Sequence, residues 1–436
     1  MARGLGSESK GKAMAGLWTG SRRGFLKDGA IALVGTFALP GFLRRAVLAQ
    51  STNSRGRKLV VVFQRGAADG LNMVVPHGEP DYYRMRPSLA IPKGQAIDLD
   101  GFFGLHPAMA PLQPLFSQGH LAIVHAAGSP DPTRSHFDAQ DYMENGTPGV
   151  KATPDGWLNR ALRAEKPGRG GSRSPFRAVA LGPRTPRTLE GSFPAVTLDR
   201  LADFRIQDSK AGGDSRSGAP LSAALQAMYA GSRDPRLRSA GRETFAAIEM
   251  LRAADPARYA PAPGADYPNT PFGSSMRQIA QLLKGDFGVE AAFTDIGGWD
   301  THHNQGGVSG QLANRLADFS RGIAAFWTDL GAQAEGVVLV TLSEFGRTAQ
   351  QNGTGGTDHG HANAMFVLGG AVRGGKVYGR WPGLAPEQLH EGRDLAITTD
   401  FRQILAEAVY RTLDARDLDL VFPGAGLRPA RFLTLI

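Results

Sequence analysis

The sequence contains no cysteine among its 436 residues. Without cysteine, no disulfide can stabilise the protein in an oxidising compartment, and no thiolate can bind a metal ion. Any metal site must therefore use histidine, aspartate, glutamate or hydroxyl oxygens as ligands. Since the chain has only ten histidines, the nitrogen ligands available to such a site are few.

After residue 49 the sequence also lacks an apolar run of the length that spans a membrane, which takes about 20 residues. We therefore expect no permanent membrane span. A strong excess of charge of one sign is missing as well. The chain has a formal net charge of +9, but eight basic and two acidic residues fall in residues 1–49, so 41 of the 49 basic and 38 of the 40 acidic residues remain beyond them. With no basic stripe among aromatics, we expect no nucleic-acid partner.

Residues 1–49 have the pattern of an export signal. The basic segment Ser21–Lys27 precedes a short apolar run, Gly29–Leu39, and Ala46–Ala49 offers small residues to a signal peptidase. Arg22 and Arg23, with Phe and Leu behind them, match the twin-arginine motif; the alternative is an ordinary secretory signal with a chance arginine pair. We predict cleavage after Ala49 and transport of the folded protein by the twin-arginine translocase, to the periplasm or outside the cell.

Residues 50–436 are long enough for a large core. Lys58–Phe63 is an unbroken apolar run, and similar runs recur at 121–124, 289–294, 336–341 and 364–368. Segments with helical spacing lie between them, notably 309–330. This alternation predicts a doubly wound, mostly parallel α/β sheet with helices on both faces. Residues from about 165 to 285, which mix short strands, loops and helices, are expected to form an insertion or cap.

Polar residues gather where the expected strands end, in the segments 65–72, 134–140, 297–305, 343–348 and 355–363. Ligands of doubly wound sheets bind at the carboxyl ends of the strands. Each short motif alone is more often an ordinary loop contact than a ligand, but convergence on one edge favours a site for one or two divalent ions such as zinc, manganese or calcium. The candidate metal ligands are Asp69, Asp300, His302, His303, Glu344, Asp358, His359 and His361.

Ser135 is the candidate nucleophile. It stands where a helix is expected to begin, so backbone N–H groups and the helix dipole would favour a bound anion there. A hydroxyl beside a divalent metal can attack phosphorus or sulfur; the alternative is that Ser135 only caps the helix. His136 is the neighbouring candidate catalytic residue, and Arg134 or Arg347 would bind the non-reacting oxygens of the anion.

Five motifs together resemble the bacterial "domain of unknown function 1501" family, which is grouped with the alkaline phosphatase and sulfatase superfamily. They are Phe63–Asn72, Arg134–Phe137, Gly298–His302, Ser343–Thr348 and Asp358–His361, and they span nearly the whole of residues 50–436 in order. The resemblance implies an alkaline-phosphatase-like α/β fold, one or two divalent metals and a serine, threonine or formylglycine nucleophile.

The resemblance also implies roles for single residues. Asp69 looks like the first metal-binding acid, Ser135 like the nucleophile, Asp300 with His302 or His303 like a ligand pair, Glu344 like the acid of an Asp-His pair, and His359 or His361 like the late histidine ligand. Here the Asp-His pair reads Glu344-Phe345, which removes a nitrogen ligand that His361 or His136 could replace. The lack of cysteine argues against a formylglycine sulfatase.

The leading hypothesis is therefore an exported, metal-dependent hydrolase of phosphate or sulfate esters that acts on a small anionic ester. A non-catalytic binding or assembly protein with a degenerate metal site is the alternative, and Phe345 in a ligand position is its main support. A redox cofactor protein is a third hypothesis, for which the sequence offers no dinucleotide fingerprint, haem motif or cysteine ligand.

Overall fold

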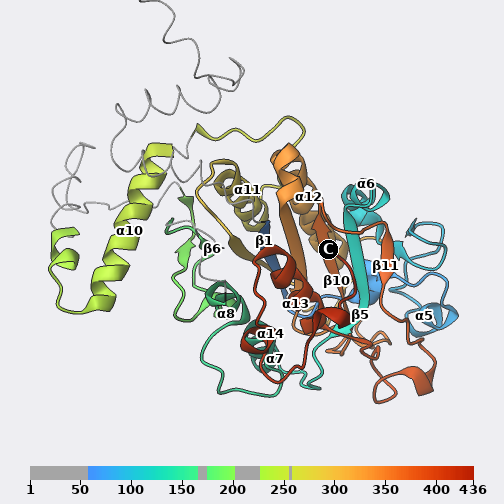
Figure 1. The fold of residues 1–436 in the computed structure, drawn as a ribbon. Helices are drawn as coiled ribbons and strands as arrows, with labels where there is room; N and C mark the ends of the chain where they lie inside the picture. The colour runs from blue at the N-terminus through green and yellow to red at the C-terminus, as the bar shows by residue number, and fades with distance from the viewer. Residues whose placement is uncertain (1–56, 165–173, 202–225, 255–257) are drawn as a thin grey trace, which may run out of the picture. The chain divides into compact units, whose positions relative to one another are not determined.

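The computed structural model describes residues 57–164, 174–201, 226–254 and 258–436 (Figure 1). The predicted export signal, residues 1–49, lies outside them. In the described part, one large sheet has the strand order β11-β5-β10-β9-β1-β8-β6-β7, and β12 pairs with β5. The strands are β1 (Lys58–Arg65), β5 (Leu121–Gly128), β6 (Ala178–Leu181), β7 (Val196–Leu198), β8 (Ala291–Gly297), β9 (Val337–Ser343), β10 (Asn363–Gly369), β11 (Lys376–Tyr378) and β12 (Thr399–Asp400).

Only β10 reverses the direction of this sheet. It pairs antiparallel with β5 and β9, whereas the other strand pairs are parallel. The prediction of a mostly parallel α/β sheet is confirmed. Because β10 runs backwards, its first residue, Asn363, lies opposite Ala127 near the end of β5. The segment that precedes β10 therefore reaches the edge where the parallel strands end.

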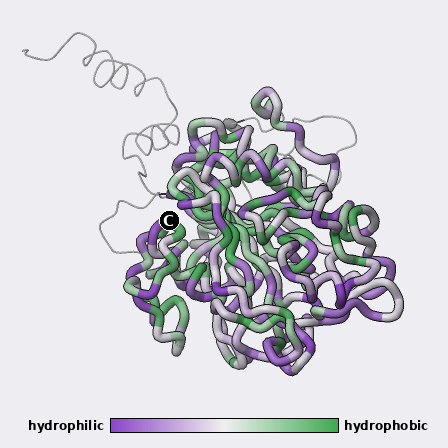
Figure 2. Tube along the Cα trace, turned by 90° about the vertical axis from the view of Figure 1, so that its right-hand side faces the viewer, coloured by the Kyte–Doolittle hydropathy of each residue, from purple (hydrophilic) through white to green (hydrophobic). Residues whose placement is uncertain are grey.

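The central strand β1 is buried on both faces, as its unbroken apolar run predicts. Side chains alternate between the two faces of a strand, so Val60 and Val62 join a core with α11 (Pro271–Lys284) and α12 (Gln311–Leu330). Leu59, Val61 and Phe63 join a second core with helices of the other face, which are α8 (Trp157–Arg163), α13 (Phe401–Thr412) and α14 (Leu418–Val421). Figure 2 shows the apolar strands passing through the middle of the molecule.

The described residues of the region expected to be an insertion or cap include strands of the main sheet. Its strands β6 and β7 pair in parallel and extend the main sheet beyond β8, and its helix α11 covers one face. These strands have only four and three residues, so neither leaves an apolar run long enough to predict from sequence.

A second sheet and further helices complete the described part of the chain. A small second sheet contains β2, β3 and β4. Among the described residues, no helix combines the length and apolar character needed to cross a membrane. The remaining elements are α4 (Gly70–Met73), α5 (Pro80–Met85), α6 (Gln113–Ser117), α7 (His136–Asn145), α10 (Pro235–Ala254), β2 (Val74–Val75), β3 (Ile97–Asp98), β4 (Gly104–Leu105), and the 3-10 helices η1 (Pro107–Leu112), η2 (Arg187–Leu189), η5 (Gly331–Gly336), η6 (Pro386–Gln388) and η7 (Pro429–Arg431).

The buried carboxylate of Asp329 fixes the C-terminal end of α12. It accepts hydrogen bonds from the Tyr259 hydroxyl at 2.6 Å, the Tyr267 hydroxyl at 2.9 Å and the Ala262 amide at 2.8 Å, and it pairs with the Lys284 ammonium at 2.7 Å. Burial by itself raises the pKa of Asp329, but these donors outweigh it and hold the pKa below its ordinary value. The ionised carboxylate therefore joins α11, α12 and the segment before α11.

We predict that Asp329→Asn lowers the free energy of unfolding by about 3 kcal/mol at neutral pH, because it leaves buried donors without their charged acceptor. Since the folded pKa is depressed, this contribution is present above the unfolded carboxyl pKa of about 3.9 and is lost as pH falls through the lower folded value. Urea unfolding at several pH values measures it.

The exposed Asp286, which follows the end of α11, provides the control for this prediction. Asp286→Asn should change the free energy of unfolding by less than about 0.5 kcal/mol. Equal effects of the two substitutions would contradict the role assigned to Asp329.

Candidate metal centre

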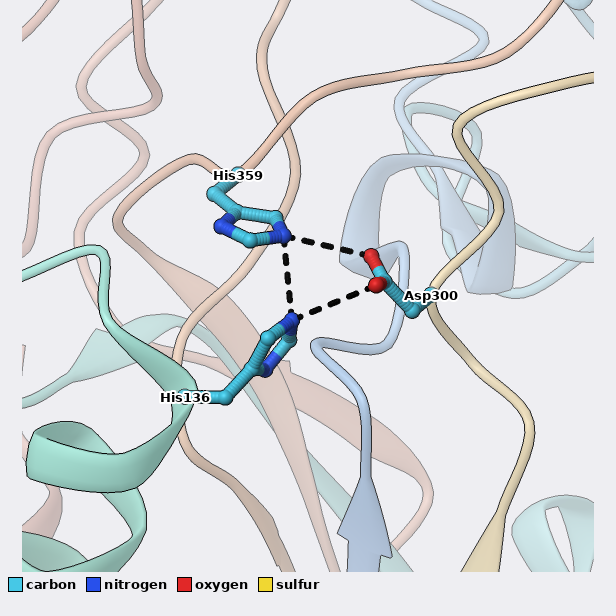
Figure 3. A group of neighbouring side chains, drawn as sticks. All are labelled: His136, Asp300 and His359. Atoms are coloured by element: carbon cyan, nitrogen blue, oxygen red, sulfur yellow. Dashed lines mark hydrogen bonds and ion pairs between the residues drawn. The ribbon is translucent and has the colours of Figure 1, made fainter.

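Three side chains from distant segments meet at the edge of the sheet where the parallel strands end (Figure 3). His136 opens α7, Asp300 follows β8, and His359 precedes β10. The Nε2 atoms of His136 and His359 lie 3.0 Å apart. The carboxylate of Asp300 lies 3.4 Å from His136 Nε2 and 3.2 Å from His359 Nε2. One ligand atom from each residue thus points to a common position.

His302 lies beside this group, outside the set of ligand atoms that are all within 4.8 Å of one another. Its Nε2 atom lies 2.9 Å from Asp300 Oδ1 and 2.9 Å from His359 Nε2. All four side chains are partly exposed, between 23% for His359 and 42% for Asp300. A ligand from solution can therefore reach them.

Close backbone packing brings these loops together. A Cβ atom on Gly66, whose φ is +116°, would lie 2.9 Å from the amide nitrogen of Asp300. A Cβ atom on Gly356 would lie 2.2 Å from the carbonyl oxygen of His302. The loops after β1 and β8 and the segment before β10 can approach this closely because glycine has no side chain.

A second set of contacts orients each imidazole. His136 Nδ1 lies 2.8 Å from Glu344 Oε1, His302 Nδ1 lies 2.9 Å from Asp358 Oδ1, and His359 Nδ1 lies 2.9 Å from the carbonyl oxygen of Arg134. A carbonyl or an ionised carboxylate only accepts hydrogen bonds, so each Nδ1 carries the proton. When such a ring is neutral, its Nε2 atom carries a free lone pair, as in histidines that bind metals.

The carboxylates around the rings are ionised. Burial raises the pKa of Glu344, but hydrogen bonds from His136 and Gln140 and from backbone amides outweigh it and leave the pKa below its ordinary value. Burial acts on Asp300 in the same direction and is outweighed by the Arg347 guanidinium, which lowers its pKa. The hydrogen bond to Glu344 raises the pKa of His136 against the effect of burial, and burial lowers the pKa of His359.

These residues fit a divalent cation. With the Nδ1 protons held by these acceptors, the Nε2 atoms of His136 and His359 and the carboxylate of Asp300 can all donate electron pairs to one cation. The separations of 2.9 to 3.4 Å are close to the roughly 3.4 Å between ligand atoms around a tetrahedral ion with bonds of about 2.0–2.1 Å. Nitrogen and oxygen ligands of this kind suit zinc or manganese.

The two arginines expected to bind an anion are paired with carboxylates of the protein. Arg347 is buried, and it donates to Asp300 Oδ1 at 2.6 Å and to Thr357. Arg134 pairs with Asp394 at 2.6 Å and with Glu391 at 2.7 Å. In this structure both guanidinium groups hold protein carboxylates, because the folded loops place those acids within reach.

The other predicted residues are distributed around the group. Glu344 and Asp358 orient histidine rings, as described above. Ser135 is exposed and caps α7, since its Oγ accepts from the Asp138 amide at 3.5 Å. His303 is exposed and outside the convergent group.

His361 and Asp69 have other partners. The ring of His361 stacks on His390 at 4.2 Å, and burial, with the nearby His390, lowers the pKa of His361 to about 4. Asp69 pairs with Arg86 at 2.6 Å. The structure does not bring either residue into the convergent group.

Phe345 stands where the superfamily has the histidine of an Asp-His pair, and in this structure it has a packing role. Its ring is buried and lies 5.0 Å from the ring of His136 and 5.1 Å from that of His359. It therefore forms an apolar wall behind two candidate ligands. Gln140, which contacts Glu344, lies in the strand-end segment 134–140, whereas Arg86, which contacts Asp69, belongs to none of the motifs found in the sequence.

The fold and this group define an α/β protein with a histidine- and aspartate-rich candidate metal centre. Over residues 56–417 the sequence matches the model of the family described as "Protein of unknown function (DUF1501)". The chain belongs to this family. None of the curated proteins matches it.

Among solved structures the chain is similar to sulfatases. A 2-O GAG sulfatase shares 9% identity at a TM-score of 0.28, with 74% of this chain and 66% of that chain covered. The PsFucS1 sulfatase from Pseudoalteromonas sp. shares 13% identity at a TM-score of 0.32, with 78% and 68% covered. The chain thus spans about two thirds of the length of these sulfatases.

We predict that Glu344→Gln weakens the binding of Zn²⁺ or Mn²⁺ by about 10- to 100-fold, because His136 loses the carboxylate that fixes its Nδ1 proton. Isothermal titration calorimetry of the metal-free protein measures the effect. Glu335→Gln, at an exposed glutamate of η5, is the matched control. Equal affinities for the two variants would refute the orienting role of Glu344.

Proposed function

We propose that the protein is an exported, metal-dependent hydrolase of phosphate or sulfate esters. The observation that carries this proposal is the convergence of His136, Asp300, His302 and His359, with each imidazole Nδ1 bonded to an acceptor. Such an arrangement is typical of metal ligands with supporting contacts.

In this proposal His136, Asp300 and His359 hold the metal, and His302 lies beside Asp300 and His359. A divalent ion held there would stabilise the negative charge that develops on the ester oxygens. Ser135, adjacent to His136 and exposed, would lose its hydroxyl proton to solvent water, and its oxygen would attack phosphorus or sulfur as the bond to the leaving oxygen breaks. The leaving oxygen would take a proton from water, and a water molecule would then hydrolyse the seryl ester and restore the serine. The N-terminus of α7 favours an anion at that position.

Arg347 and Arg134 then act as positioning residues. Arg347 holds Asp300 through its guanidinium. The carbonyl oxygen of Arg134 accepts the Nδ1 proton of His359 while its guanidinium holds Asp394. The substrate we propose is a small anionic ester.

The proposed route of export rests on Arg22 and Arg23 and the apolar run behind them. The twin-arginine translocase carries folded proteins, so the metal can be acquired before export. The location that follows from this route is the periplasm or the cell exterior.

A binding or assembly protein with a metal but no catalysis is the second candidate. The observation that favours it is that Arg134 and Arg347 are both paired with protein carboxylates. Neither guanidinium is then placed to bind the oxygens of a substrate.

We predict that Ser135→Ala lowers the turnover of aryl phosphate or aryl sulfate esters at least about 1000-fold and leaves the metal content unchanged. Turnover of the purified protein with Zn²⁺, Mn²⁺ or Ca²⁺ and elemental analysis measure the two quantities. Ser309→Ala, at another exposed serine, is the control and should retain full turnover.

Asp300→Asn separates the two candidate functions. A hydrolase loses both metal and turnover in this variant. If the wild type binds metal but turns over none of the esters, the binding protein is favoured. If Ser135→Ala keeps wild-type turnover, Ser135 is not the nucleophile.

A further inference from the structure

We infer that the metal centre holds a single divalent ion, and that Arg86 provides a permanent positive charge among oxygen atoms that could otherwise hold a second ion. The inference rests on the proposed metal centre. It concerns the two fully buried acids that follow β1 and β9, Asp69 and Glu344.

The charge of Asp69 is compensated by the protein itself, while its buried Oδ1 atom has no hydrogen-bond partner among the described residues. Its Oδ2 atom accepts from Arg86 Nη1 at 2.6 Å and from Gln305 Nε2 at 2.6 Å. Both Asp69 and Arg86 are 0% exposed. A buried carboxylate requires a compensating charge, and here the guanidinium supplies it.

The guanidinium of Arg86 is surrounded by oxygen. Besides Asp69, it donates to Asn72 Oδ1 at 2.8 Å, to the Thr348 carbonyl at 2.7 Å and to the Ala349 carbonyl at 2.9 Å. Carboxylate, amide and carbonyl oxygens are the ligands that hard divalent cations take. A guanidinium stays protonated in proteins, so this cage is permanently filled by a cation of the chain.

Glu344 is committed as well. Its Oε1 atom accepts from the Gly66 amide at 2.8 Å, from Gln140 Nε2 at 2.9 Å and from His136 Nδ1 at 2.8 Å. Its Oε2 atom accepts from the Ser343 hydroxyl at 3.1 Å. A second metal ion at Glu344 would face the hydrogen atoms of these donors.

The Arg86–Asp69 pair is connected to the proposed metal centre through a chain of hydrogen bonds. Gln305 donates to Asp69 and accepts from Thr357 Oγ1 at 2.7 Å. Arg347 donates to the same Thr357 oxygen at 3.1 Å and to Asp300 at 2.6 Å. Arg86 is therefore linked to Asp300 through Asp69, Gln305, Thr357 and Arg347.

The number of bound ions tests this inference. The metal-free full chain is incubated with excess Zn²⁺, Mn²⁺ or Ca²⁺ and desalted, and the ions per chain are counted by elemental analysis and native mass spectrometry. We expect one ion in the wild type and in Asp69→Asn, and none in Asp300→Asn. Two ions in the wild type, or loss of the ion in Asp69→Asn, would overturn the inference.

The Arg86 variants test the role of the guanidinium. Arg86→Ala vacates the oxygen cage, so it should bind a second Mn²⁺ or Ca²⁺ and gain thermal stability when that ion is added; the double variant Arg86→Ala/Asp69→Asn should return to one ion. A count of one in folded Arg86→Ala would overturn the role of Arg86. If Arg86→Ala does not fold, the counts of the wild type and Asp69→Asn decide.

Failure of the inference is distinguishable from failure of the proposed function. A wild type that binds no ion under any of these conditions contradicts the metal centre itself, and the inference falls with it. A wild type that binds two ions keeps the metal centre and the proposed hydrolase but overturns the single-ion site.

Discussion

The site depends on which nitrogen atom of each imidazole carries the proton. Glu344, Asp358 and the Arg134 carbonyl each take the Nδ1 proton of one histidine, so the three Nε2 lone pairs face inward with Asp300. A divalent cation bound by these atoms would add its charge to that of the Arg347 guanidinium, which lies 2.6 Å from Asp300. The contacts of Glu344, Asp358 and the Arg134 carbonyl hold the three imidazole rings in this orientation.

The sheet topology makes the arrangement possible. The parallel strands β8 and β9 deliver Asp300, His302 and Glu344 from their carboxyl ends. His359 stands before a strand, and it reaches the same edge because β10 is antiparallel to its neighbours. One reversed strand thus adds an imidazole that a purely parallel sheet would place at the opposite edge.

Much of the fold and part of the site could be predicted from the sequence. The buried strands β1, β5, β8, β9 and β10 have apolar runs, and the clustering of His136, Asp300, His302 and His359 follows from their positions at strand ends. The pairing of Asp69 with Arg86 and the stacking of His361 on His390 could not be predicted. They depend on the directions of side chains in loops, which tertiary contacts set and local sequence does not. The same holds for the arginines, whose acidic partners are distant in the chain.

The proposed ligands come from three segments separated by more than fifty residues, and this has a consequence for folding. Before β8 and β10 have joined the sheet, a partly folded chain presents at most the neighbouring pair Asp300 and His302. The complete set exists only in the finished domain, so an ion that binds it binds the native state alone. Its whole binding free energy then adds to stability. A bound ion would therefore hold together segments from both halves of the chain.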